Sequence, residues 1–123
     1  MATIAASSGV SASTSDRPPL GRGRVYAIAF DMDIESLRMH YGDPYNNAYG
    51  EIRAILKRHG FNWQQGSVYF GGAEVNAVTC VLAAIDLSSA LPWFSSSVRD
   101  IRMLRIEELN DLMPAVQQPR SDG

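Results

Sequence analysis

Apolar side chains recur along residues 25–113 at the spacings of alternating strands and helices, beginning with a strand at Val25–Met32. Its β-branched and aromatic residues alternate with small alanines, so apolar side chains fall on both faces of the strand. This pattern is typical of a central strand, with neighbours on both sides. Polar side chains enter only at its carboxyl end, as Asp31 and Asp33.

Two helices are expected next. A short one covers Ile34–Tyr41, with Asp33 as N-cap and Gly42 as its stop. A long one starts at Asp43-Pro44, where an acidic N-cap precedes proline at the first helical position, and ends at Gly60. Its buried stripe is predicted to comprise Tyr45, Ala48, Tyr49, Ile52, Ile55, Leu56 and His59.

The second half of the chain repeats the alternation. Phe61–Phe70 is predicted to be a strand broken near Gln65-Gly66, Glu74–Leu91 a second long helix, and Val98–Glu107 a final strand. The predicted buried side of the second helix is Val75, Val78, Val81, Leu82, Ile85 and Leu91. The order βαββαβ predicts an α+β fold of the ferredoxin-like kind, with two long helices on one face of a small sheet.

The final strand also predicts an assembly. Apolar and charged residues are mixed on both of its faces, and a strand with apolar residues on its outer face often meets a second subunit. We therefore expect a homodimer.

Composition limits the folded domain to residues 25–113. Residues 1–24 are mainly Ala, Ser, Gly, Thr and Pro, which predicts a disordered tail, and residues 114–123 predict a flexible C-terminal tail. No segment has the length and hydrophobicity of a signal peptide or a membrane span. The single Cys80 excludes an intrachain disulfide and a multi-cysteine zinc site, so we expect a protein of the reducing cytoplasm.

The overall charge of the chain gives no global positive field that would attract nucleic acid. The formal net charge is −2, but the tail carries three arginines against one aspartate, whereas residues 25–113 carry seven basic and eleven acidic groups, which gives −4. An anionic polymer would therefore have to be bound by a local arginine patch.

The most specific chemical feature is the pair Asp31 and Asp33. Two carboxylates at i and i+2 share one face if the strand continues, which suits acid–base chemistry or divalent-metal binding. Asp33 is well placed as an N-cap. Asp31 has no capping role, so we interpret it as a functional carboxylate rather than a structural salt-bridge partner.

Other polar residues fit phosphate chemistry, each beside a simpler structural interpretation. Arg99, Arg102 and Arg105 form an arginine cluster beside the carboxylate of Asp100, unless they are only cross-strand ion pairs. Ser67 can hydrogen-bond a phosphate, although a serine after glycine is usual in turns. His40 and His59 are not spaced so that they could share a proton relay or a ligand. A two-histidine ribonuclease mechanism within one chain therefore has only weak support. The aromatic residues can stack on bases, although in a small domain they are more often core or dimer contacts; they are Trp63, Tyr69, Phe70, Trp93 and Phe94.

Four strings together resemble one known family. YAIAFDMDIESL, YGDPYNNAYGEIR, HGFNWQQGSVYFG and PWFSSSVRDIRMLRIEE are similar to the virulence-associated protein D family over residues 25–113, while residues 1–24 lie outside the resemblance. The resemblance implies a modified ferredoxin-like fold, homodimers, and endoribonuclease activity, in some members as the toxin of a toxin–antitoxin pair.

The same resemblance implies site residues. The family's catalytic strand-end aspartate falls on Asp31, and its other positions implicated in cleavage fall on Leu37, Ser67 and Asp100. Family members typically begin with Met where Val25 stands here. We therefore expect translation to start at residue 25, which the intact mass of protein from the native locus would test.

These observations lead to an expected function. We expect an endoribonuclease for single-stranded RNA, with Asp31, Ser67 and Asp100 in catalysis, Arg99, Arg102 and Arg105 near phosphates, and Leu37 in the cleft wall. Asp31 acts as general base on a 2′-OH, or Asp31 of each subunit holds a divalent cation such as Mg²⁺. The expected partners are RNA, a second copy and a small antitoxin protein, with no membrane. The alternative is a non-catalytic dimeric module that binds RNA or protein.

Overall fold

In the computed structural model, which describes residues 24–119, four antiparallel strands form one sheet in the order β3-β4-β2-β5. The strands are β2 (Val25–Met32), β3 (Phe61–Gln65), β4 (Val68–Gly71) and β5 (Val98–Ile106). The predicted central position of β2 is confirmed, since it pairs with β4 and β5. The break near Gln65-Gly66 is also confirmed. Of the predicted tail 1–24, only Arg24 lies among the described residues.

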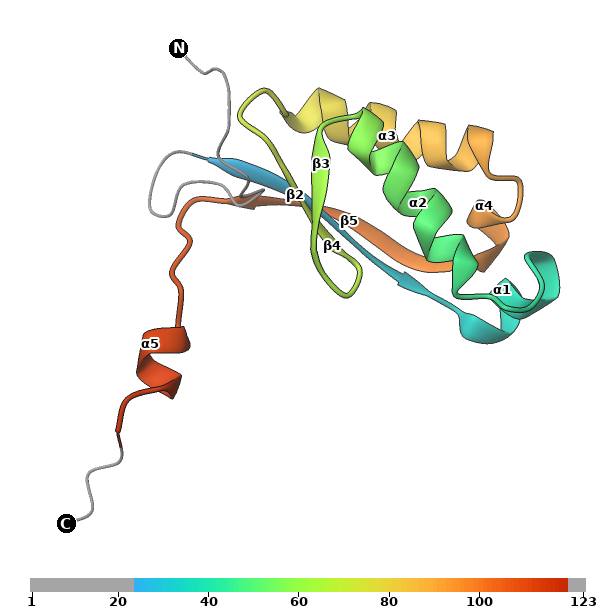
Figure 1. Ribbon diagram of the computed structural model, residues 1–123. Coiled ribbons are helices and arrows are strands. Elements are labelled where there is room, and N and C mark those ends of the chain that lie inside the picture. The colour runs from blue at the N-terminus through green and yellow to red at the C-terminus, as the bar shows by residue number, and fades with distance from the viewer. Residues whose placement is uncertain (1–23, 120–123) are drawn as a thin grey trace.

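The three predicted helices are present, together with two short ones that were not predicted. They are α1 (Ile34–His40), α2 (Asn47–Arg58), α3 (Ala77–Ala90), and two short ones, α4 (Phe94–Ser97) and α5 (Met113–Val116). The long helices α2 and α3 lie side by side, and α5 stands away from the rest of the molecule (Figure 1). The fold is α+β and is compatible with a ferredoxin-like arrangement. No helix within residues 24–119 is long and apolar enough to cross a membrane.

One core joins the sheet to both long helices. Ile28, Phe30 and Met32 share a face of β2 and are buried together with side chains of α2 and α3. The helical contributions are Ala48, Ile52, Ile55 and Leu56 from α2 and Cys80, Ala83 and Leu87 from α3. The carboxyl end of β2 emerges from this core into solvent, which is where the polar residues begin.

The start of α2 differs from the prediction. The helix begins at Asn47 with Asn46 at the N-cap position, so Asp43 and Pro44 lie in the preceding loop. The Asp43 carboxylate lies 3.6 Å from Arg38 Nε of α1 instead of capping a helix. An acid before proline therefore indicated a turn here rather than a helix start.

The predicted buried side of the second long helix was wrong at four of its six positions, whereas Val75 and Leu91, which lie outside α3, are buried as predicted. Val78, Val81, Leu82 and Ile85 are each more than half exposed, and the side facing the sheet is Cys80, Ala83 and Leu87. The helix also starts later than predicted, because Asn76 and Thr79 form a capping box at its N-terminus. A helix that is apolar all round has no unique buried side in its sequence. The small Cys80 and Ala83 allow α3 to pack closely against β2.

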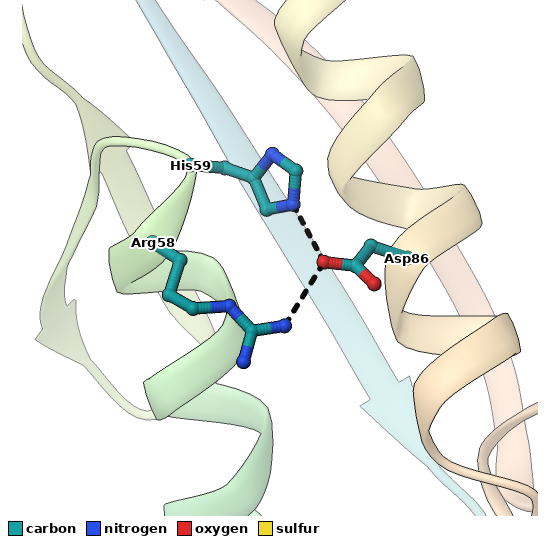
Figure 2. A network of polar contacts seen from close by, with 3 residues as sticks. All are labelled: Arg58, His59 and Asp86. Atoms are coloured by element: carbon teal, nitrogen blue, oxygen red, sulfur yellow. Dashed lines mark hydrogen bonds and ion pairs between the residues drawn. The ribbon is translucent and has the colours of Figure 1, made fainter.

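A polar cluster ties the end of α2 to α3. Asp86 Oδ2 lies 2.8 Å from His59 Nε2 and 3.1 Å from Arg58 Nη2, as Figure 2 shows. Hydrogen bonds from His59 and then from Arg58 lower the pKa of the Asp86 carboxyl. The sequence explained His59 by packing and the helix dipole alone. The structure adds a carboxylate partner twenty-seven residues away.

Candidate active site at the end of strand β2

The carboxyl end of β2 holds two carboxylates around one guanidinium. Arg99 Nη1 lies 3.6 Å from Asp31 Oδ2, and Arg99 Nη2 lies 3.7 Å from Asp33 Oδ1. The Asp31 side chain is 62% exposed. The site is thus a charged and solvent-accessible group of side chains rather than a buried salt bridge.

An irregularity in the sheet explains how Arg99 reaches both carboxylates. Asp31 pairs with Asp100 and Met32 pairs with Val98, so Arg99 is an extra residue on β5 with no partner opposite. Such bulges re-aim a side chain, and they are common beside active sites. The register shift therefore places the guanidinium between the two acidic groups.

Asp100 faces Asp31 across the strand pair. Like charges directly opposite each other in a sheet are unfavourable unless cations lie nearby. Here Arg102 Nε donates a 2.9 Å hydrogen bond to Asp100 Oδ2, while Arg99 lies beside Asp31. The two predicted site carboxylates and two of the three predicted arginines therefore form one cluster.

Ser67 reaches the same strand end from the β3–β4 turn. Its carbonyl oxygen accepts a 3.1 Å hydrogen bond from the backbone N–H of Phe30, the residue before Asp31. Gly66 before it has a φ of +52°, in the left-handed region that glycine favours. The turn thus holds the backbone of Ser67 against the residue that precedes Asp31. Its predicted role as a phosphate contact stays a prediction.

Asp33 lies at the predicted N-cap position of α1, but its side chain makes no capping hydrogen bond to the helix. Its carbonyl accepts from the Leu37 N–H at 2.8 Å, and its carboxylate accepts from the Ser36 hydroxyl at 2.9 Å. Its backbone N–H donates to Ser97 O at 2.8 Å. The acidic side chain therefore remains available to Arg99.

Leu37 and Arg105 lie apart from this cluster. Leu37, expected in the cleft wall, is fully buried in the core, so it can act on a site only through the packing of α1. Arg105 pairs with Tyr26 at the other end of β2, about 16 Å along the strand from Asp31. Its Nε donates to Glu107 at 2.9 Å.

Helix α2 supplies side chains that sequence reasoning missed. Tyr49 was predicted only as part of the buried stripe. Burial raises the pKa of its hydroxyl, and the negative charges of Tyr45 and Asp31 raise it further. One turn later, Arg53 lies over the Trp63 ring of β3. The spacing of Tyr49 and Arg53 on one helical face was the available signal.

The arrangement is suited to chemistry on an anionic group. An exposed carboxylate can accept a proton, two guanidinium groups can neutralise a phosphate, and a hydroxyl lies within the same cluster. Among residues 24–119, no three His, Cys, Asp or Glu side chains are grouped as metal ligands.

Sequence comparisons find closely similar curated proteins. The chain is 53% identical over 93 residues to Endoribonuclease VapD 2 of Riemerella anatipestifer, which covers 75% of this chain and 99% of that protein. It is 48% identical over 93 residues to Endoribonuclease VapD of Dichelobacter nodosus, covering 76% and 98%. For the Endoribonuclease VapD homolog of Helicobacter pylori, the identity is 47% over 93 residues, covering 76% and 97%. No family model matches the chain.

Proposed function

The chain belongs to the VapD endoribonuclease family, and on that premise we propose that it is an endoribonuclease that cleaves single-stranded RNA at the end of β2. The observation that carries this proposal is the position of Arg99, whose guanidinium lies between the carboxylates of Asp31 and Asp33. A proton acceptor and a phosphate-binding cation are thereby adjacent and exposed. These are the two groups that cleavage of RNA by its own 2′-OH requires.

The proposed reaction starts with proton transfer to Asp31. Its carboxylate takes the proton of the 2′-OH, and the 2′-oxygen attacks the adjacent phosphorus. The bond from phosphorus to the 5′-oxygen breaks, and that oxygen takes a proton from solvent. The products are a 2′,3′-cyclic phosphate and a 5′-OH. Arg99 and Arg102 stabilise the charge on the phosphoryl oxygens, and Ser67 orients one of them.

A metal-dependent route is the second mechanism. Mg²⁺ prefers oxygen ligands, and Asp31 from each of two subunits would hold such an ion. Bound there, it would supply activation of a water molecule, and cleavage by that route would leave a 5′-phosphate. Within one chain, Arg99 already supplies the positive charge beside Asp31, which favours the route through the 2′-OH.

Product analysis tests both the activity and the mechanism. Purified full-length protein is incubated with labelled single-stranded RNA, with and without EDTA, and the ends of the fragments are identified. The proposal predicts cyclic phosphate ends that form equally in EDTA. A 5′-phosphate product that EDTA abolishes would replace this mechanism with the metal route.

Absence of cleavage would favour the other candidate, a non-catalytic module. The net charge of −4 over residues 25–113 gives that candidate some support, because it leaves only local patches for RNA. RNA binding by a protein that never cuts RNA would establish it.

The assembly we propose is a homodimer of ferredoxin-like subunits. The exposed residues Val78, Val81, Leu82 and Ile85 follow one face of α3, and an apolar cavity of about 150 Å³ lies beside them, between α3 and β5. Asp86 is the only charged residue on α3, and it is bound to α2, so pairing two copies along this face brings no like charges together. We call these four residues the α3 stripe.

Cellular context completes the proposal. We propose a cytoplasmic toxin that a small antitoxin protein neutralises, on the strength of the resemblance described above. Growth arrest on induced expression, relieved by co-expression of a neighbouring small gene, would support this role. Growth that is unaffected by an active nuclease would contradict it.

A further inference from the structure

Arginine stacks on an aromatic ring at two places outside the Asp31 cluster, and the acid–base chemistry uses neither. Arg53 of α2 holds its guanidinium carbon 4.3 Å from the centre of the Trp63 ring of β3. Arg38 of α1 lies in the same way over Tyr45, at 4.9 Å. Aromatic rings and guanidinium planes are the surfaces on which proteins stack unpaired nucleobases.

The Trp63 stack is connected to the candidate active site by hydrogen bonds. Trp63 Nε1 donates to Gly66 O at 2.8 Å, in the turn that carries Ser67. Ser67 O in turn accepts from the N–H of Phe30, next to Asp31. A strand of RNA that contacts Asp31 and Ser67 therefore lies within a few side chains of the indole.

Helix α2 connects the Trp63 stack to the sheet. Burial raises the pKa of Tyr69 on β4, and a hydrogen bond from Arg53 partly offsets that rise, so the Arg53 guanidinium lies near both Tyr69 and the Trp63 ring. Trp63 is the cross-strand partner of Tyr69, and Tyr69 is in turn the partner of Ile28 on β2. Trp63, with Arg53 over its ring, therefore lies on the same sheet as Asp31, two strands away from β2.

Trp63 has the exposure of a binding residue. The ring is 44% exposed although its only polar atom is already hydrogen-bonded within the chain. Arg53 beside it is also exposed, and the salt bridges of residues 24–119 do not include it. Both groups are preorganised and accessible, so a base can stack on them without displacing a structural contact.

We propose that Arg53 and Trp63 form a stacking track for the unpaired nucleobases near the cleaved phosphate. The inference rests on the proposed function, because RNA is the ligand. In this proposal the protein contacts the flat faces of the bases rather than their hydrogen-bonding edges. Because only unpaired bases expose their faces, the track favours single strands over duplexes and has no strict sequence requirement.

Equilibrium binding of a short labelled single-stranded RNA tests the track. The full-length chain carries Asp31→Asn throughout, so that the RNA stays intact. Trp63→Leu removes the ring and should weaken binding about 5- to 150-fold, the loss of one stacked base. Trp63→Phe keeps a ring but loses the N–H bond to Gly66, and should bind within about threefold of the parent because stacking is retained.

Charge loss is tested separately. Arg53→Gln should weaken binding about tenfold, because it removes both the stacked plane and its charge. Lys57→Gln, which removes the same charge one turn further along α2, is the matched control and should bind like the parent. With an RNA of the same length that lacks its bases, Trp63→Leu should make no difference.

The outcomes separate this inference from the proposed function. If Trp63→Leu and Arg53→Gln bind intact RNA like the parent, or if Lys57→Gln loses as much affinity as Arg53→Gln, the track is wrong whether or not the protein cleaves RNA. If the chain with Asp31 cuts no RNA but the track variants still lose affinity, the nuclease proposal is wrong and the track stands. Thermal unfolding of Arg53→Gln, an exposed substitution, confirms that a binding loss is not unfolding.

Discussion

Arg99 determines at the residue scale what the end of β2 can do. Without it, Asp31, Asp33 and Asp100 would be a set of neighbouring negative charges that repels a phosphodiester. With its guanidinium between Asp31 and Asp33, the same site can hold a phosphate beside a proton acceptor. The carboxylates and Arg99 were recognisable in the sequence as candidates. Their geometry could not be predicted from the sequence, because it depends on a bulge in β5 that no residue pattern indicates.

Ser97, which supports this strand end, gives a stability prediction. Its carbonyl binds the N–H of Asp33 at 2.8 Å, but its fully buried hydroxyl has no hydrogen-bond partner among residues 24–119. A buried hydroxyl without a partner costs free energy, so Ser97→Ala should leave the free energy of unfolding unchanged or raise it by about 1 kcal/mol. Urea denaturation measures this. A decrease of more than about 1 kcal/mol would show that the hydroxyl makes a stabilising contact.

At the element scale, helix α3 shows which structural features the sequence pattern predicts and which it does not. The existence of the helix was predictable from its length and composition. Its orientation was not, because the sequence offers apolar residues on every side and only tertiary packing selects Cys80, Ala83 and Leu87. The strands were easier to predict, since β-branched and aromatic residues define β2 and a break at Gly66 separates β3 from β4.

The contact between α2 and α3 makes stability depend on pH. Hydrogen bonds from His59 and Arg58 lower the pKa of Asp86 below its ordinary value of 3.8. Its ionised form therefore stabilises the folded state fully above that ordinary value, and this contribution is lost as the pH falls through the lowered folded-state pKa. Asp86→Asn should destabilise the protein near neutral pH and flatten the acid limb of its stability curve.

Thermal unfolding midpoints from neutral pH to about pH 2 measure this effect. Glu35→Gln, at an exposed position of α1 that has no salt bridge within the described residues, should retain the steepness of the parent curve. Equal steepness for the parent and Asp86→Asn would mean that the Asp86 cluster contributes nothing to acid sensitivity.

Charge and assembly matter at the scale of the whole molecule. The folded domain carries a net −4, yet Arg99 and Arg102 gather at the carboxyl end of β2. Under the proposed function, RNA is recognised locally at that end. The α3 stripe offers a separate surface for a second copy of the chain.

The proposed dimer is tested by a charge placed in the α3 stripe. Leu82→Asp should convert the dimer to a monomer without lowering the unfolding temperature of the subunit, because Leu82 is 53% exposed and outside the core. Light scattering coupled to gel filtration measures the mass. Ala54→Asp, an exposed position on α2, is the matched control and should remain dimeric. A dimer in both variants would move the interface elsewhere.

Cleavage of labelled single-stranded RNA by Asp31→Asn, compared with the parent chain, tests the central claim most directly. The side chain is exposed, so the substitution should leave the unfolding temperature and oligomeric state unchanged. Loss of the general base should lower the cleavage rate by about 10²- to 10⁴-fold. Cleavage at the parental rate, in a preparation shown to be free of other ribonucleases, would contradict the account.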